Sequence, residues 1–118
     1  MRGVFELLKN RPLIRTVEAM SCNLNEDGGM NIASALPHVL GLETLLIGDC
    51  KFGSDACMEI FNGLSKNKSL KRLNLSNNSM TGNIEFENYQ YEVGALVALK
   101  KALSVNTTIE ELDISDNG

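Results

Sequence analysis

Few side chains in this 118-residue chain are of the types that perform chemistry, and their spacing does not favour it. The chain holds three cysteines and a single histidine, His38. No pair of these residues has the spacing of a metal site, and none stands beside a partner that would activate a nucleophile. The sequence also lacks the glycine-rich motifs that bind phosphate. We therefore predict that the protein is not an enzyme and has no catalytic residues, no metal and no cofactor.

Charged residues at matched places of the sequence are suited to binding a protein. Lys71 and Arg72 are adjacent, and they correspond to Glu110 and Glu111 in the repeat described below. A surface that carries both signs of charge selects its partner by charge complementarity. An apolar side chain on the same face, such as Leu46, further favours a binding surface. The predicted protein-binding residues of this surface are Leu46, Lys71, Arg72, Asn74, Glu110, Glu111 and Asp113.

A second candidate for binding is the segment 81–93, TGNIEFENYQYEV. Its residues Phe86, Tyr89 and Tyr91 are half of the aromatic residues of the chain, and three glutamates but no basic residue accompany them. Apolar residues at every second position favour a small hairpin. Loops on a rigid repeat often carry binding specificity, and aromatic residues are favoured interface anchors. We predict that these three aromatic residues bind protein.

Both surfaces also have a purely structural interpretation. Arg15, Glu43, Lys71 and Glu110 occupy matched positions with alternating sign, so that neighbours could form ion pairs between strands. Such pairs contribute roughly 0.2 to 1 kcal/mol each. The aromatic residues of segment 81–93 could instead fold back onto the helices and fill space. The sequence leaves these alternatives open.

The composition limits the kinds of partner. A net charge of −4, a pI near 4.9 and eleven dispersed basic residues argue against nucleic acid. No apolar run approaches the roughly 20 residues that cross a bilayer, and no signal peptide opens the sequence. An odd number of cysteines fits a reducing compartment. We expect a cytoplasmic, intracellular protein that binds another protein and neither nucleic acid nor membrane.

The elements that position these residues are encoded by a phrase that recurs along the chain. Residues 42–52 (LETLLIGDCKF) and 70–80 (LKRLNLSNNSM) share one pattern at an interval of 28 residues. The pattern extends back to residues 14–24, whereas the fourth phrase, 109–117 (IEELDISDN), begins 39 residues after the third. The alternation of apolar residues inside each phrase predicts a short strand.

A helix is predicted after each strand. In residues 55–64 the apolar side chains recur at intervals of three and four, which is typical of an amphipathic helix. Asp27 and Asp55 occupy matched positions at the helix starts, where a carboxylate can cap free N–H groups. Asn67 and Asn106 are expected to close the helices. Each unit is therefore a strand, a turn, a helix and a return loop.

One position of the phrase alternates between cysteine and asparagine. Cys22 and Cys50 occupy it in the first two phrases, and Asn78 and Asn117 in the last two. This position requires a small group that donates a hydrogen bond to the carbonyls of the neighbouring turn. A thiol and an amide are therefore predicted to be interchangeable here, whereas Cys57 is predicted to be buried on a helix.

The phrases at 42–52, 70–80 and 109–117 closely resemble leucine-rich repeats, and the 28-residue period resembles the ribonuclease-inhibitor-like type. The resemblance implies an α/β leucine-rich repeat solenoid, a short right-handed α/β horseshoe arc with a parallel sheet on the concave face and helices on the convex face. It also implies a single domain over residues 1–118. Its parts are a helix of a preceding unit at 1–12, repeats at 13–41, 42–69 and 70–108, a partial repeat at 109–118, and an insertion loop at 81–93.

Similar repeats occur in ribonuclease inhibitors, in immune receptors of the nucleotide-binding type, in GTPase-activating proteins for Ran, and in the actin regulators tropomodulin and capping-protein linkers. The resemblance therefore implies a non-catalytic protein-protein interaction module or scaffold that binds through the concave sheet and the 81–93 loop. One alternative is a regulator of a small GTPase or of actin assembly. Another is an architectural subunit or a fragment of a longer repeat array, because neither end of the sequence has a polar capping unit and a second copy could associate there.

Overall fold

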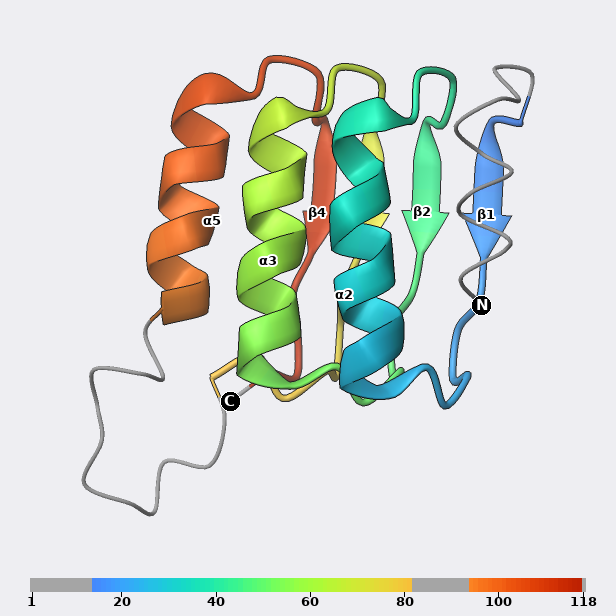
Figure 1. The fold of residues 1–118 in the computed structure, drawn as a ribbon, viewed down its shortest axis with the longest axis vertical. Coiled ribbons are helices and arrows are strands. Elements are labelled where there is room, and N and C mark those ends of the chain that lie inside the picture. Colours follow the sequence, from blue (N-terminus) through green and yellow to red (C-terminus); the bar gives the residue numbers. More distant parts are fainter. Residues whose placement is uncertain (1–13, 82–93, 118) are drawn as a thin grey trace.

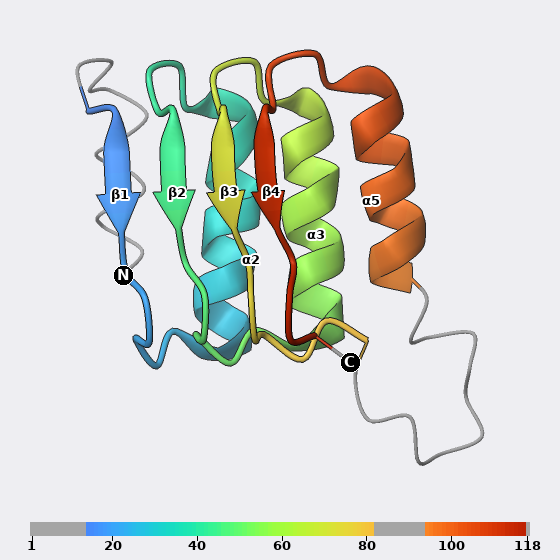
Figure 2. The ribbon, with the colours of Figure 1, turned by 180° about the vertical axis from the view of Figure 1, so that it is seen from behind.

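Four short strands and the helices that cover one of their faces make up the computed structural model, which describes residues 14–81 and 94–117. The strands form one parallel sheet in the order of the chain, with the helices in front of it in Figure 1 and behind it in Figure 2. The strands are β1 (Thr16–Glu18), β2 (Thr44–Leu46), β3 (Arg72–Asn74) and β4 (Glu111–Asp113). The helices are α2 (Asn25–Ala35), the 3₁₀ helix η1 (Leu36–His38), α3 (Gly53–Lys66) and α5 (Gly94–Val105).

The strand register follows the spacing of the repeated phrases. Thr16 pairs with Thr44, Thr44 with Arg72, and Arg72 with Glu111, so that the intervals are 28, 28 and 39 residues. The longer third interval leaves the register of β3 and β4 unchanged, because its additional residues lie in the connection that leads to α5. This arrangement confirms the α/β solenoid with a parallel sheet. The segments 1–13 and 82–93, which include the predicted preceding helix and nearly all of the predicted insertion, lie outside the described residues.

The core lies between the sheet and the helices. The middle residue of each inner strand, Leu45 in β2 and Leu73 in β3, is buried, and the flanking residues of the strands are more exposed. On α3, the side chains of Ile60, Phe61 and Leu64 are fully buried, as the spacing of three and four predicts. Helix α3 packs against α2 on one side and α5 on the other. Each unit therefore buries its apolar residues against its neighbours.

The helices begin earlier than the acidic residues predict. Helix α2 begins at Asn25 and α3 at Gly53, which places Asp27 and Asp55 inside the first turn. Neither helix has a side-chain hydrogen bond at its N-cap, so the predicted capping by these carboxylates is wrong. Their charges still lie near the positive end of the helix dipole. No helix within residues 14–81 and 94–117 combines the length and apolar character that crossing a membrane requires.

At the repeat position that holds either asparagine or cysteine, the asparagine amide forms more kinds of hydrogen bond than the cysteine thiol. The Asn78 side chain donates to the backbone oxygens of Ile47 (3.0 Å) and Ser76 (3.2 Å), and its Oδ1 accepts the N–H groups of Cys50 (2.8 Å) and Phe52 (3.4 Å). The Cys50 thiol donates in the same way, to the carbonyls of Ala19 (3.0 Å) and Gly48 (3.4 Å). A thiol has no amide oxygen, so the two groups share only the donor role.

One flank of α5 exposes apolar side chains that are covered in the preceding unit. Leu96 and Leu103 are 42% and 46% exposed, whereas Cys57 and Leu64, their equivalents on α3, are 0% exposed. The difference arises because α5 covers these positions of α3, while no described element packs beyond α5. The helix pattern in the sequence is the same in both units. Burial at these positions therefore depends on a following unit.

Candidate functional site

The side chains that point away from the helices form a continuous surface on the sheet. Because the strands are parallel and in register, equivalent residues of successive strands lie next to each other. The sequence-predicted residues of this surface come from three strands and the residues just before them. We call them the concave patch, and they are Leu46, Lys71, Arg72, Asn74, Glu110, Glu111 and Asp113.

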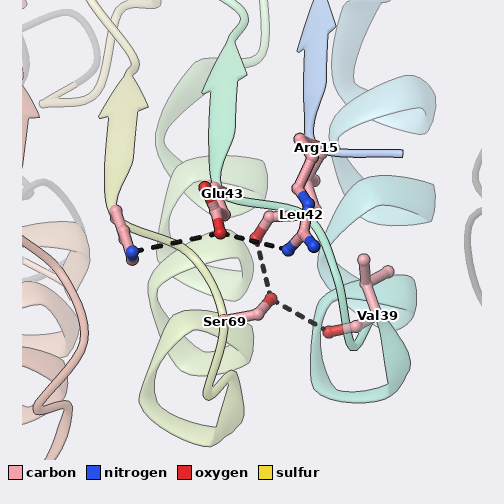
Figure 3. Close-up of polar contacts among 6 residues, drawn as sticks. Arg15, Val39, Leu42, Glu43 and Ser69 are labelled. Atoms are coloured by element: carbon pink, nitrogen blue, oxygen red, sulfur yellow. Dashed lines mark hydrogen bonds and ion pairs between the residues drawn. The ribbon is translucent and has the colours of Figure 1, made fainter. Parts of the chain in front are cut away.

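Ion pairs connect neighbouring strands at the start of the sheet. One Glu43 oxygen lies 3.2 Å from a guanidinium nitrogen of Arg15 and 3.9 Å from Nζ of Lys71. A dashed line in Figure 3 marks the contact between Arg15 and Glu43. Arg72 Nε lies 3.5 Å from a Glu111 oxygen on the next strand. These contacts confirm the predicted cross-strand pairing for Arg15, Glu43 and Lys71, whereas the described residues show no ion pair of Glu110. The participating side chains are between 33% and 70% exposed, so each pair contributes little to stability, on the order of 0.5 kcal/mol.

A shallow hollow lies in the middle of the concave patch. It has a volume of about 250 Å³ and is formed by residues of β2, β3 and β4. Leu46 supplies an apolar side chain on one side, and the Arg72–Glu111 ion pair supplies both signs of charge. The hollow is therefore mixed in character, as protein-binding surfaces are. Its lining residues are Leu46, Arg72, Leu73, Asn74, Glu111, Leu112 and Asp113.

Two side chains of the patch are fixed by the turns that follow their strands. Oδ1 of Asn74 accepts hydrogen bonds from the N–H (2.9 Å) and Oγ (2.7 Å) of Ser76. Oδ1 of Asp113 makes the same two contacts with Ser115, at 2.9 and 2.6 Å. These bonds, first from the hydroxyl and then from the backbone, lower the pKa of the Asp113 carboxyl. Asp113 is therefore a fixed negative charge at neutral pH.

The structure brings together most of the predicted surface, but in two places. Leu46, Arg72, Asn74, Glu111 and Asp113 line the central hollow. Lys71 and Glu110 lie at the starts of their strands and line a second, larger hollow of about 410 Å³. The predicted aromatic residues Phe86, Tyr89 and Tyr91 lie outside the described residues.

Met20, the other apolar residue on this face, has a structural role. It is 38% exposed, and its sulfur accepts the N–H of Gly48 at 3.1 Å. A Cβ at Gly48 would lie only 2.7 Å from the Met20 terminal methyl. The side chain thus covers the glycine of the neighbouring unit. Its partial exposure is not an independent sign of binding.

Three exposed residues at or near the helix-to-strand connections are not among the residues that the sequence predicts. Leu40 is 74% exposed, and Lys66 and Lys68 are exposed on either side of the buried Asn67. A signal was present, because a buried asparagine flanked by lysines at alternate positions forces both lysines outward. Neither lysine belongs to the repeated phrase, because Lys66 is the last residue of α3 and Lys68 lies in the loop that follows.

Neither a metal-binding cluster nor a buried thiol with a lowered pKa occurs among the described residues. Among them, no group of three or more histidine, cysteine and acidic side chains could hold a metal ion. All three cysteines are free, and Cys50 and Cys57 are buried. Burial raises the pKa of the Cys57 thiol from 9.0 to about 12 and also raises that of Cys50, so both remain protonated at neutral pH. These thiols fill space in the core.

Comparison with known protein families identifies repeats in two parts of the chain. Residues 69–87 match a family described as Leucine Rich Repeat, and residues 105–118 match a second family of the same description. The first match begins in the loop before β3, the second begins at the last residue of α5, and each includes a strand, β3 or β4. They therefore coincide with the third and fourth repeated phrases.

Two individual proteins extend the similarity over nearly the whole chain. The chain is 30% identical over 112 residues to a ribonuclease inhibitor of Mus musculus, an alignment that covers 93% of this chain and 22% of that protein. Among solved structures, leiomodin-1 actin-binding site 2 superposes with a TM-score of 0.76 at 21% identity, covering 93% of this chain and 58% of that one. The chain thus spans about a fifth of the length of the ribonuclease inhibitor.

Proposed function

We propose that this chain, a leucine-rich repeat protein of the ribonuclease-inhibitor-like type, is a non-catalytic interaction module that binds a protein partner through the concave patch. The observation that carries the proposal is the central hollow, where the apolar Leu46 lies beside the Arg72–Glu111 ion pair. A rigid parallel sheet holds these groups, so binding requires little ordering of the surface. Three free cysteines fit a cytoplasmic module.

The charges of the patch support a partner with both basic and acidic groups. Glu111 is 70% exposed in its side chain and Arg72 is 46% exposed, so the ion pair is accessible from solvent. A partner that inserts between them would exchange this weak pair for new contacts. We propose that Phe86, Tyr89 and Tyr91 add aromatic contacts at the rim, because the connection from β3 to α5 that contains them adjoins the patch in the sequence.

Binding assays with candidate partner proteins test the proposal. A pancreatic ribonuclease and monomeric actin are the first probes, because the two similar proteins are named for them. A panel of small GTPases tests the regulatory alternative, with GTP hydrolysis as the readout. Partners found by cross-linking are then measured by calorimetry with the purified chain.

Substitutions in the patch decide whether any such binding uses it. Arg72→Glu and Leu46→Glu should each weaken binding by at least about tenfold, since the first reverses a charge in the hollow and the second adds a charge in place of its apolar side chain. The matched control is Lys101→Glu on the exposed face of α5. Tyr89→Ala with Tyr91→Ala tests the loop. A partner whose affinity is insensitive to both hollow variants would contradict the proposal.

A second candidate function is architectural, and the exposed flank of α5 favours it. Leu96 and Leu103 are about half exposed, and β4 is the last strand of the sheet among the described residues. A strand edge and an apolar helix flank are what one solenoid unit offers to the next. We propose that a second copy or a neighbouring subunit covers this flank.

Sedimentation equilibrium tests the self-association form of this candidate. The chain should show concentration-dependent mass, and Leu96→Ser with Leu103→Ser should remove it. A mass that stays at one chain over the whole accessible concentration range would exclude self-association. Lys100→Ser is the control, because it introduces a serine on the same helix without removing an apolar side chain and should leave the self-association unchanged.

A further inference from the structure

The starts of the strands form an edge of the molecule whose charge differs from that of the whole chain. Because the sheet is parallel, all the loops that run from a helix to the next strand meet at this edge, which is the upper one in Figure 1. The chain has a net charge of −4. At this edge, however, basic residues outnumber acidic ones. Within residues 14–81 and 94–117, the charged residues at this edge are Arg15, Lys66, Lys68 and Lys71 against Glu43 and Glu110.

The opposite edge carries the compensating negative charge. It contains the turns that lead from the strands into the helices, at the lower side of Figure 1. Its described charged residues are Glu26, Asp27, Asp49, Asp55 and Asp116, against Lys51. The molecule is therefore polarised along the strand direction. A surface of locally positive potential attracts acidic groups even though the whole chain is acidic.

Two adjoining hollows lie along the basic edge. The first, of about 410 Å³, is lined by Arg15, Glu43 and Lys71 among others, and the second, of about 480 Å³, is lined by Pro37, Val39 and Lys66. Leu40 and Lys68 line both hollows. We call this continuous feature the return-loop groove. At 74% exposure, Leu40 is the most exposed of the large hydrophobic side chains in the described residues, and it stands at the junction of the hollows.

Hydrogen bonds fix the loops that form the groove. Asn67 is 3% exposed, and its amide donates to the backbone oxygens of Leu36 (2.8 Å) and Val39 (3.3 Å) in the preceding loop. Oγ of Ser69 lies 2.8 Å from the Leu42 carbonyl oxygen and 3.3 Å from that of Val39, as Figure 3 shows. The groove is therefore formed before any partner binds, which lowers the entropy cost of binding.

The positive charge of the groove is only partly neutralised. Glu43 contacts Arg15 and Lys71 through the same carboxylate oxygen. With Glu110, two acidic side chains line the groove against the four basic ones Arg15, Lys66, Lys68 and Lys71. Neither Lys66 nor Lys68 takes part in an ion pair within residues 14–81 and 94–117. Both lysines are exposed. They are consequently available to carboxylates of another molecule.

We propose that the return-loop groove binds an acidic peptide segment with one apolar side chain between its carboxylates. The apolar side chain packs on Leu40, one carboxylate meets Lys66 and Lys68, and another meets Arg15 and Lys71. A nucleic acid fits less well, because its backbone carries a phosphate at every position and has no apolar side chain to pack on the exposed Leu40. The return-loop groove shares Lys71 and Glu110 with the concave patch but no residue with its central hollow, and the inference does not depend on the proposed function.

Fluorescence anisotropy of labelled probes tests the inference on the full chain. The probe is a fluorescein-labelled peptide with two acidic residues on each side of one phenylalanine, and it should bind saturably with a Kd of roughly 10 to 100 µM. Serine in place of the phenylalanine should weaken binding, and so should higher salt. A labelled oligothymidylate serves as the alternative polyanion. Equal or tighter binding of the oligothymidylate would overturn the proposal.

Variants of the groove separate local recognition from net charge. Lys66→Gln with Lys68→Gln, and separately Leu40→Ser, should each weaken peptide binding by about fivefold or more. Lys100→Gln with Lys101→Gln removes the same charge from α5 and should leave binding unchanged. Arg72→Glu, which tests the central hollow, should also have little effect. If the groove variants bind the peptide as the unaltered chain does, the inference is wrong whatever the outcome for the concave patch.

Discussion

Asparagine side chains that are buried or partly buried join neighbouring units through hydrogen bonds that an apolar residue could not form. In the strand-to-helix turns, the Asn78 side chain forms hydrogen bonds with the backbone of the preceding unit. Asn67 and Asn106 do the same for the return loops, since Asn106 donates to the carbonyls of Leu64 (2.9 Å) and Asn67 (3.0 Å). Each asparagine thus satisfies backbone groups that a loop would otherwise leave unpaired.

Replacing Asn78 should therefore be costly. Asn78→Ala leaves the N–H groups of Cys50 and Phe52 and several turn carbonyls without partners, and we expect a loss of about 2 to 4 kcal/mol in the free energy of unfolding. Asn78→Cys should lose less, because a thiol keeps the donor role that Cys50 performs. Urea unfolding measures both. The exposed Asn23→Ala is the control, and equal stability of Asn78→Ala and this control would refute the assignment.

The three thiols should differ in reactivity. Cys22 is exposed, whereas Cys50 and Cys57 are buried, and burial raises the pKa of Cys57 from 9.0 to about 12. At pH 8 the buried thiols are protonated and inaccessible, so a thiol reagent should label one cysteine of the native chain and three in denaturant. The folded state favours the neutral Cys57 thiol. Its contribution to stability is present below pH 9 and is lost as the pH rises toward 12. Rapid labelling of more than one thiol in the native chain would contradict this burial.

At the scale of elements, the spacing between α2 and α3 depends on small residues. A Cβ at Gly63 would lie 2.7 Å from the backbone oxygen of Ala33, and one at Gly29 would lie 2.7 Å from Cβ of Ala56. A contact with backbone cannot be relieved by rotating a side chain. The two helices therefore pack at a distance that only glycine permits at these positions.

Gly63→Ala should destabilise the protein although alanine favours a helix. The propensity gain is at most about 1 kcal/mol, whereas overpacking against Ala33 costs about 1 to 3 kcal/mol. We expect a net loss and a lower Tm. Gly94→Ala is the matched control, because its Cβ would meet only the flexible Met58 sulfur at 3.3 Å. A Tm for Gly63→Ala equal to or above that of the control would show that the helices adjust freely.

At the scale of the whole molecule, the position of a unit in the array decides how deeply its apolar residues are buried and how much they contribute to stability. Leu64 on α3 and Leu103 on α5 occupy equivalent places, but Leu64 is fully buried and Leu103 is 46% exposed. The sheet shows the same trend, because Leu73 is buried while Leu112 is only partly buried. The stability of a solenoid is a sum over units and their interfaces, so the inner unit should be the more sensitive.

Truncation of the two equivalent leucines measures this difference. Leu64→Ala should lower the free energy of unfolding by about 3 kcal/mol, because it leaves a cavity in a closed core. Leu103→Ala should lower it by about 1 kcal/mol. Chemical unfolding of both variants gives the comparison. If the chain associates through α5, the cost of Leu103→Ala should rise with protein concentration. If both variants lost the same free energy of unfolding at low protein concentration, Leu103 would be as buried in solution as Leu64, which would contradict the prediction.

The fold could be predicted from the sequence because its information is local and repeated. A short alternation of apolar residues specifies each strand, the 28-residue interval sets the register, and a matched asparagine or cysteine marks each turn. The ion pairs between strands follow from this register. The helix starts could not be predicted as well, since Asp27 and Asp55 favour the N-terminal dipole wherever in the first turn they stand.

The sequence by itself determined the repeat, the parallel register and the rows of charge on the sheet face, because these depend on periodicity alone. Only the tertiary structure decided which apolar residues are exposed, as Leu40 and Leu103 show, because exposure depends on the neighbouring unit. It alone also gathered Arg15, Lys66 and Lys68 at one edge. Loops far apart in sequence meet there because parallel strands all begin on the same side, and this edge is where the proposed acidic peptide binds.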